Sequence, residues 1–159
     1  MEKQWQDVLD RFHYGIYLVT IAAGEEFNGM IASWLTQCSH EPPLVAVAIR
    51  SNRLSHAQIM ETGKFCINVL PRECAGIIGQ FKIADWKNKF RAFPFTLSPA
   101  GLPVLDDCIG WLDCSPDRTI ETGDHTLFIG RITGGGMKNA HKTATLSTAD
   151  YAGVYRGVK

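Results

Sequence analysis

The apolar run Leu-Val-Ala-Val-Ala-Ile at residues 44–49 most limits the folds open to this chain. It follows the pair Pro42-Pro43, which interrupts regular structure, and it contains no polar side chain. A strand that is apolar on both faces has to be covered on both sides. One face carries large branched side chains and the other carries two alanines, so the second face leaves room for a neighbour. We therefore expect a central, fully covered strand at residues 44–49.

Short strand-like runs separated by turn residues fill much of the remaining chain. β-Branched and aromatic residues predict further strands at residues 17–22, 27–37, 64–70, 109–114, 118–122 and 125–133. The two runs that begin at 109 and 118 are expected to flank a turn at residues 115–117. The triplet at residues 134–136, which is all glycine, is expected to end regular structure. Strands of this number and spacing favour a mainly β fold, a barrel with short helices outside it.

Few segments have helical periodicity. Apolar residues at three- and four-residue spacing predict a short amphipathic helix over residues 4–12. Ser55 followed by Gln58 forms a capping-box pattern, which predicts a second helix that ends near Gly63. With 159 residues, the chain has the length of one domain, and we expect a single domain over residues 1–159.

The charge balance excludes some classes of partner. Sixteen basic and sixteen acidic side chains cancel, so no overall field attracts the chain to nucleic acid or to an anionic membrane. No run approaches the ~20 apolar residues of a membrane span, and the polar start lacks an apolar signal region. The five cysteines have no spacing typical of a metal or redox motif, and the histidines are scattered, so no metal site is expected. These features favour a soluble, cytoplasmic protein with reduced cysteines.

The turn Ser51-Asn52-Arg53-Leu54-Ser55 leads directly into the expected second helix. Unpaired backbone N–H groups at a helix start attract anions, and an arginine with small polar neighbours adds to that attraction. The turn therefore predicts a cradle for phosphate. The alternative is a plain helix cap at Ser55 with Arg53 in solvent.

Two other places suit a flat ligand. Ala32-Ser33-Trp34 offers small side chains beside an aromatic one, which lets a planar ring approach the backbone. His125 follows Asp124 at the head of a strand, where it could orient a nicotinamide while Asp124 biases its charge. The alternatives are a half-exposed strand and a turn histidine without a role. The basic and aromatic stretch at residues 81–91 is either a site for the phosphates of a dinucleotide or a solvated face.

Together these segments resemble the flavin reductase-like family, which binds flavin mononucleotide (FMN) in a split β-barrel. Four blocks carry the resemblance in the family's order. They are Gly-Ile-Tyr-Leu-Val-Thr at 15–20, Asn-Gly-Met-Ile-Ala-Ser-Trp at 28–34, Pro-Pro-Leu-Val-Ala-Val-Ala-Ile at 42–49 and Gly-Asp-His-Thr-Leu-Phe-Ile-Gly at 123–130. Ile31 departs from the pattern, since many members have threonine there. Flavoredoxin-like proteins and the flavin domain of fused flavin–rubredoxin reductases form the most similar subgroup.

The resemblance implies roles for particular residues. The flavin ring and ribityl chain would be flanked by Asn28, Met30, Ala32, Ser33 and Trp34. The phosphate end would be held by Ser51, Asn52, Arg53 and Ser55. His125 would lie near the nicotinamide as the catalytic residue. The family is typically a homodimer with flavin near the subunit interface, which the tail over residues 137–159 would help to build.

The function implied is an FMN-dependent NAD(P)H oxidoreductase, a flavin reductase that passes a hydride from NADH or NADPH to flavin and on to an acceptor. The chain has no rubredoxin-type cysteine pairs, so an iron-containing redox partner such as rubredoxin, or another flavoprotein, would be a separate protein. The alternative is an FMN-binding electron-transfer protein, similar to flavoredoxin, that does not oxidise nicotinamide directly.

Overall fold

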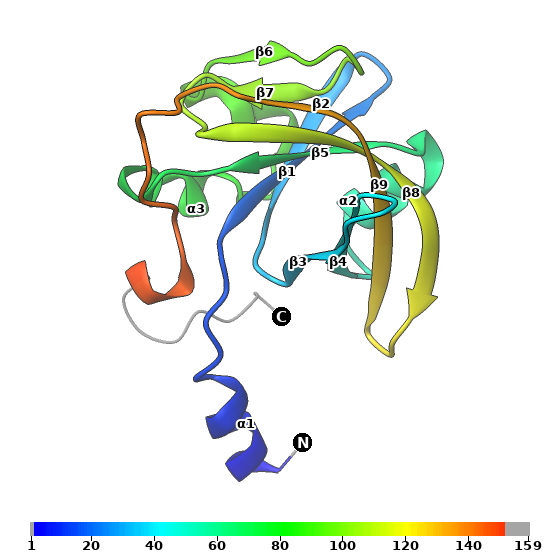
Figure 1. Cartoon of the computed structure of the whole chain (residues 1–159), viewed down its shortest axis with the longest axis vertical. Helices are drawn as coiled ribbons and strands as arrows, with labels where there is room; N and C mark the ends of the chain where they lie inside the picture. The colour runs from blue at the N-terminus through cyan, green and yellow to red at the C-terminus, as the bar shows by residue number, and fades with distance from the viewer. Residues whose placement is uncertain (1, 152–159) are drawn as a thin grey trace.

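A single curved antiparallel sheet dominates the computed structural model, which describes residues 2–151 (Figure 1). Its strand order is β2-β1-β5-β8-β9-β4-β3. The bounds are β1 (Tyr17–Ala23), β2 (Glu26–Ala32), β3 (Leu35–Ser39), β4 (Leu44–Arg50), β5 (Phe65–Val69), β8 (Gly110–Glu121) and β9 (His125–Met137). The strands β6 (Phe95–Leu97) and β7 (Pro103–Leu105) form a separate ribbon. The expected mainly β fold with short helices is confirmed.

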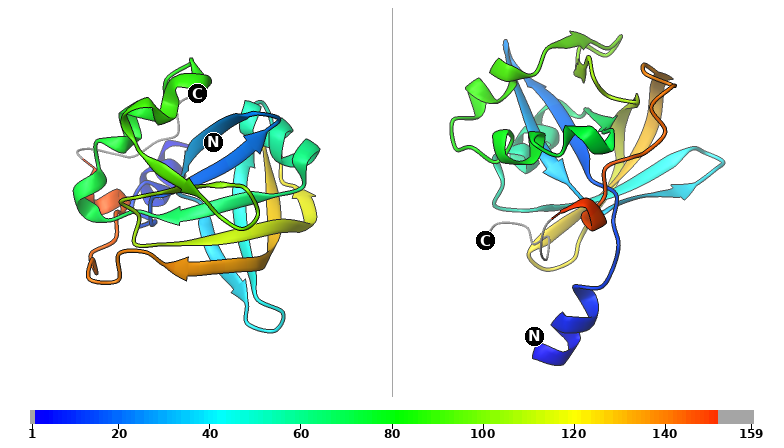
Figure 2. Two further views of the ribbon diagram at one scale, coloured as in Figure 1. Left: turned by 90° about the horizontal axis from the view of Figure 1, so that it is seen from above. Right: turned by 90° about the vertical axis from the view of Figure 1, so that its left-hand side faces the viewer.

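The helices are short and lie outside the sheet (Figures 1 and 2). They are α1 (Lys3–Leu9), α2 (Leu54–Thr62) and α3 (Ile77–Gln80), with 3-10 segments η1 (Arg72–Cys74), η2 (Trp86–Ala92) and η3 (Thr148–Asp150). Helix α1 projects away from the sheet, and it buries none of its residues. The aromatic side chains of Trp5 in α1 and of Phe12 just after it are 60% and 52% exposed, so the described chain leaves much of their apolar surface uncovered.

The strand predicted at residues 44–49 is β4, and it lies between β9 and β3 as expected of a covered strand. Val47 and Ile49 belong to an apolar core that also contains Phe65 and Phe128. A second core lies under the β6–β7 ribbon and is centred on residues such as Leu18 and Leu102. The sheet therefore separates two apolar layers, and both of its faces are covered near β1 and β5.

The single strand expected over residues 27–37 is wrong. The chain forms two strands there, because it leaves β1 at the end of β2 and pairs with β4 from Leu35 onward. Ser33 and Trp34 lie at this crossing. The backbone N–H of Ala48 donates to the carbonyl oxygen of Trp34 at 2.9 Å, which fixes the crossing against β4.

The turn expected at residues 115–117 is also wrong, since β8 runs through it without interruption. Pro116 lies opposite Gly130, and a register shift between Pro116 and Arg118 lets the ladder accommodate a residue that has no N–H. Asp117 accepts a hydrogen bond of 2.7 Å from the guanidinium of Arg131 on β9. The bulge and this pair keep the two long strands together where a break was expected.

The glycine triplet does not end regular structure, which is a third correction. Gly134, Gly135 and Gly136 continue β9 opposite residues 111–113 of β8. A Cβ atom on Gly135 would lie 2.7 Å from Leu112 Cδ2 and 2.8 Å from the Trp111 carbonyl oxygen. The triplet therefore permits a close approach between two strands instead of marking a loop.

The described part of the tail packs back on the barrel. Leu146 is buried, and its backbone bridges the N–H of Ile16 and the carbonyl oxygen of Leu70, both at hydrogen-bonding distances of 2.8–2.9 Å. Isolated bridges join Ser147 to Gly15 and Thr145 to Pro71. The remainder of the expected interface tail, residues 152–159, lies outside the described residues.

All five cysteines are unpaired. Cys66, Cys108 and Cys114 are buried, whereas Cys38 is exposed on the edge strand β3. Burial raises the pKa of the Cys108 thiol to about 11 and that of Cys114 to about 12, and raises the pKa of Cys66 further still. Among residues 2–151 no helix is long and apolar enough to cross a membrane.

Candidate functional site

Strand β2 and helix α2 are joined by a buried amide. The Nδ2 atom of Asn28 donates to Gln58 Oε1 at 2.6 Å and lies 3.4 Å from Ser55 Oγ. Its Oδ1 atom accepts the backbone N–H of Gly29 at 2.8 Å. The capping box predicted from Ser55 and Gln58 is therefore wrong, because both side chains turn inward to Asn28. The N-cap position is Arg53, which makes no side-chain cap, while Gly63 ends the helix as expected in the left-handed conformation.

A lysine from the basic stretch completes this network. Lys89, on η2, is only 8% exposed, and its Nζ atom donates to the Gly29 carbonyl oxygen at 2.8 Å and to Asn28 Oδ1 at 3.2 Å. Burial, together with the positive charge of Arg53, lowers the pKa of Lys89 to about 8. Within residues 2–151 no carboxylate forms an ion pair with Lys89.

A second lysine of the same stretch adds to the positive charge. Burial and the charge of Arg53 also lower the pKa of Lys82. Arg53, Lys82 and Lys89 are named here the cationic cluster, because the charge of Arg53 disfavours the positive charge of each of the two lysines. A bound anion would relieve that repulsion. The sequence left the role of residues 81–91 open, and it gave no sign that Lys89 would meet Asn28.

The predicted phosphate turn joins the end of β4 to the start of α2. Ser51, Asn52 and Arg53 are exposed, while Ser55 is buried. The backbone N–H of Ser51 donates to the carbonyl oxygen of Asp124 at 3.1 Å, and its hydroxyl donates to the same oxygen at 3.3 Å. The turn is therefore tied to the segment that carries His125, which itself pairs with Arg50 across the sheet.

His125 is held between a carboxylate and an indole. Its Nδ1 atom lies 2.7 Å from Asp124 Oδ1, and this hydrogen bond lowers the pKa of Asp124. The guanidinium of Arg50 lies 4.0 Å from the other carboxylate oxygen. The ring of Trp34 lies 4.8 Å from the His125 ring, at an interplanar angle of 36°, and Trp34 remains 50% exposed. The side chain can thus present a fixed Nε2 atom to a ligand.

The other predicted ring contacts lie along β2. Asn28, Met30 and Ala32 alternate along the strand and so share one face of it. Asn28 and Ala32 are buried, whereas Met30 and Ser33 are partly exposed. The structure thus brings the predicted residues into two groups on either side of the turn at 51–55. One group is built around Asn28, and the other around His125.

Within residues 2–151 no group of three or more histidine, cysteine, aspartate or glutamate residues could hold a metal ion. The candidate site instead combines a cationic cluster, an aromatic pair and small residues on a strand. Such a set suits an aromatic ligand that carries phosphate.

Comparison with known proteins identifies the family of this chain. The Flavin reductase like domain model matches residues 9–159. The chain belongs to this family, which confirms the resemblance seen in the sequence.

Individual relatives agree with the family. The chain is 37% identical over 124 residues to the "High molecular weight rubredoxin" of Moorella thermoacetica, covering 76% of this chain and 54% of that protein. It is 32% identical over 134 residues to a "Flavin reductase" of Pseudomonas putida, covering 83% and 78%. The solved structure of Streptomyces globisporus NADH:FAD oxidoreductase SgcE6 superposes with a TM-score of 0.78 at 26% identity, covering 84% and 81%. The chain spans about half the length of the Moorella protein.

Proposed function

We propose that the chain is an NAD(P)H-dependent flavin reductase that binds FMN at the turn between β4 and α2. The observation that carries this proposal is the buried ammonium of Lys89, which lies beside Arg53 and forms no ion pair with a described carboxylate. A buried charge is costly unless it is paired. The phosphate of FMN would supply the missing negative charge, and charge-assisted hydrogen bonds to Arg53 and Lys89 would hold it.

We assign the predicted residues as follows. Ser51, Asn52, Arg53 and Ser55 belong to the phosphate end, joined by Lys89. Met30, Ala32, Ser33 and Trp34 border the flavin ring. Asn28 has both ends of its amide engaged, so we assign it to positioning Lys89 and Ser55. In these assignments the phosphate lies at residues 51–55, beside the group around Asn28. The flavin ring extends toward Trp34, in the group around His125.

His125 is the residue we assign to the nicotinamide. Asp124 accepts from its Nδ1 atom, so Nε2 is the ring nitrogen left to meet the substrate. When bound, the flavin accepts a hydride from the nicotinamide and passes electrons on. The chain's own task is to hold the two rings together and to exclude water, for which Trp34 and His125 are placed at one end of the site. The names of the relatives above support this activity.

We further propose that the chain forms a homodimer and passes electrons to a separate redox protein. The exposed aromatic side chains in and just after α1 support a homodimer, because Phe12 contacts Tyr14 and Tyr14 contacts Trp34 in a line that leads to His125. A second copy bound along this line would cover the edge of the site. The Moorella relative supports a separate rubredoxin or flavoprotein as the electron acceptor. The unpaired cysteines support a reducing, cytoplasmic setting. We also propose that residues 1–159 form a single domain.

The same relative supports a second candidate function, an FMN-binding electron carrier that does not oxidise nicotinamide. Anaerobic stopped-flow mixing of FMN-loaded protein with NADH, and separately with NADPH, distinguishes the two. Rapid loss of flavin absorbance is the result expected for a reductase. If protein that holds FMN loses no flavin absorbance with either nucleotide, the chain is an electron carrier and not a reductase. Protein that cannot be loaded with FMN at all would refute both.

A further inference from the structure

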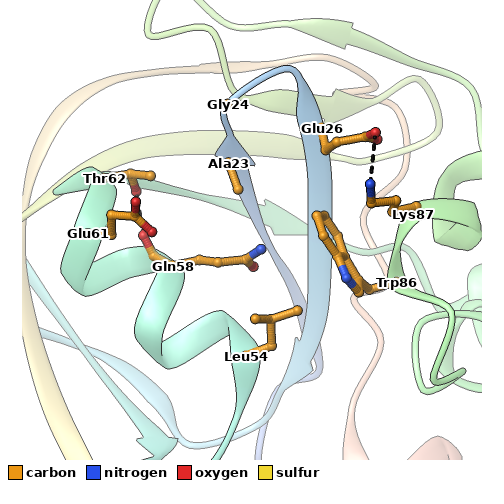
Figure 3. Close-up of a pocket in the computed structure, with 9 residues that line it drawn as sticks. All are labelled: Ala23, Gly24, Glu26, Leu54, Gln58, Glu61, Thr62, Trp86 and Lys87. Carbon is orange, nitrogen blue, oxygen red and sulfur yellow. Dashed lines mark hydrogen bonds and ion pairs between the residues drawn. The ribbon is translucent and has the colours of Figure 1, made fainter.

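A pocket opens between helix α2, the β1–β2 hairpin and η2, next to the turn that carries Arg53. It has a volume of about 430 Å³, within the range of small-molecule sites. Residues from three elements surround it: the β1–β2 hairpin, the face of α2 that looks toward this hairpin, and the start of η2 (Figure 3). Leu54, which directly follows Arg53 in the chain, belongs to its wall. The pocket is therefore adjacent to the turn where the proposed function places phosphate.

The pocket has the walls that a flat ring needs. Leu54 contributes an aliphatic surface and is 47% exposed, and Trp86 contributes a partly buried indole from the opposite side (Figure 3). A gap between an aromatic and an aliphatic side chain favours a flat aromatic ligand, because such a ligand can stack on both walls. Stacking uses the faces of the ligand ring and leaves the polar groups on its edge free for hydrogen bonds.

The floor of the pocket is polar and has a fixed orientation. Gln58 is 5% exposed and reaches from α2 toward the β1–β2 hairpin (Figure 3). Its Oε1 atom accepts from Asn28 at 2.6 Å, whereas its Nε2 atom donates to no described residue. The network around Asn28 thus fixes which end of the amide faces the pocket. The amide presents N–H donors to an occupant.

An acceptor lies one turn further along the same helix. Glu26 pairs with Lys87 at 3.3 Å, whereas Glu61 forms no ion pair within residues 2–151. Glu61 therefore leaves a carboxylate available on the wall next to Gln58. A ring nitrogen that accepts and an exocyclic amino group that donates, side by side on a flat heterocycle, would satisfy both groups. Adenine has that edge.

We propose that this pocket receives the adenine ring of a dinucleotide whose phosphates lie at the cationic cluster. This inference rests on the proposed function, because the adenine dinucleotides of such a reaction are FAD and NAD(P)H. Leu54 lies between the two places, so the ligand passes only the first turn of α2. Gln58 and Lys89 both bind Asn28, so the ring end and the phosphate end share one hydrogen-bonded unit.

The first test measures the base itself in the full chain. AMP and ribose 5-phosphate, which lacks the base, are titrated by calorimetry against the wild type, Trp86→Ala and Trp86→Phe. AMP is expected to bind more tightly than ribose 5-phosphate. Trp86→Ala is expected to weaken AMP binding roughly tenfold, and Trp86→Phe far less, because a stacked face is kept. Met60→Ala, on the same helix but outside the pocket, is the matched control and should change neither affinity.

The second test identifies the source of the ring. If it belongs to FAD, FAD binds more tightly than FMN, and Trp86→Ala removes the difference. If it belongs to the nicotinamide dinucleotide, FAD and FMN bind equally, and Trp86→Ala raises the KM for NADH or NADPH at unchanged FMN affinity. Equal binding of AMP and ribose 5-phosphate would overturn the proposal, even in protein that binds FMN. If the protein binds AMP but cannot bind FMN, the proposed function is overturned, whereas the assignment of this pocket to an adenine ring is kept.

Discussion

The Nζ atom of Lys89 lies 2.8 Å from the carbonyl oxygen of Gly29, so an ammonium from η2 is fixed directly against strand β2. The two residues are 60 positions apart in the sequence. Their contact joins a surface segment to the strand that carries most of the predicted ring contacts.

Lys89→Met is expected to weaken FMN binding roughly ten- to hundredfold, because a hydrogen bond to a charged group contributes about 1.5–3 kcal/mol. Fluorescence quenching of FMN on titration with protein measures the affinity. Lys87→Met, on the same segment but exposed and paired with Glu26, is the control. Equal losses in the two variants would mean that overall charge, and not the position of Lys89, holds the ligand.

The low pKa of Lys89 also predicts a pH dependence of stability without ligand. The folded chain loses this proton near pH 8, whereas the unfolded chain keeps it until near its ordinary value of 10.5. Between these values the unfolded state binds more protons, so this residue makes the free energy of unfolding rise with pH. Urea unfolding from pH 7.5 to 10 measures it. The wild type should gain more stability across that window than Lys89→Met, and identical pH profiles would contradict the prediction.

Arg53→Ala is expected to weaken FMN binding while changing riboflavin binding little, because only FMN carries the phosphate. Affinities for the two flavins, measured side by side, give the result. Arg118→Ala is a suitable control, since Arg118 is exposed and pairs with its neighbour Asp117 on β8. A parallel loss of both flavins would assign Arg53 to the fold or to the ring.

His125→Ala is expected to slow flavin reduction by pyridine nucleotide more than it weakens FMN binding. Asp124→Ala should slow the same step less, because it removes only the partner that fixes the His125 ring. Stopped-flow rates and FMN affinities are compared for each variant. The reverse ranking, with affinity lost and rate kept, would move His125 from the nicotinamide to the flavin.

Gly29→Ala is expected to destabilise the fold by about 1–3 kcal/mol through overpacking. A Cβ atom there would lie 2.6 Å from Phe81 Cε1, in a buried strand. Gly79→Ala, where a new Cβ would meet nothing within 4 Å, is the control. Chemical unfolding at one pH measures both. A Gly29→Ala protein as stable as the control would mean that Phe81 moves aside without cost.

Local patterns in the sequence identified most of the sheet, because alternation and β-branched residues report burial directly. These patterns gave wrong predictions where a contact with a residue distant in the sequence determines the local structure. Pro116 is typical of a turn, yet it lies within β8, because the ladder shifts register next to its partner Gly130. The glycines at 134–136 read as a loop, yet they allow β8 to come close.

The same limit applies to the candidate site. The turn at 51–55 and His125 could be found because a local pattern marks each of them. Lys89 could not, because its partners Asn28 and Gly29 lie 60 or more residues earlier. Ser55 and Gln58 were assigned to a helix cap because the sequence does not reveal that Asn28 competes for both.

A protein that handles reduced flavin in air works beside a source of hydrogen peroxide. Peroxide attacks thiolates far faster than thiols, so a cysteine that stays protonated is protected. The raised pKa values of Cys66, Cys108 and Cys114 keep these core thiols in the inert form, and their burial keeps the oxidant out. Oxidative damage is thereby directed away from both cores and toward the more accessible thiols of Cys38 and Cys74.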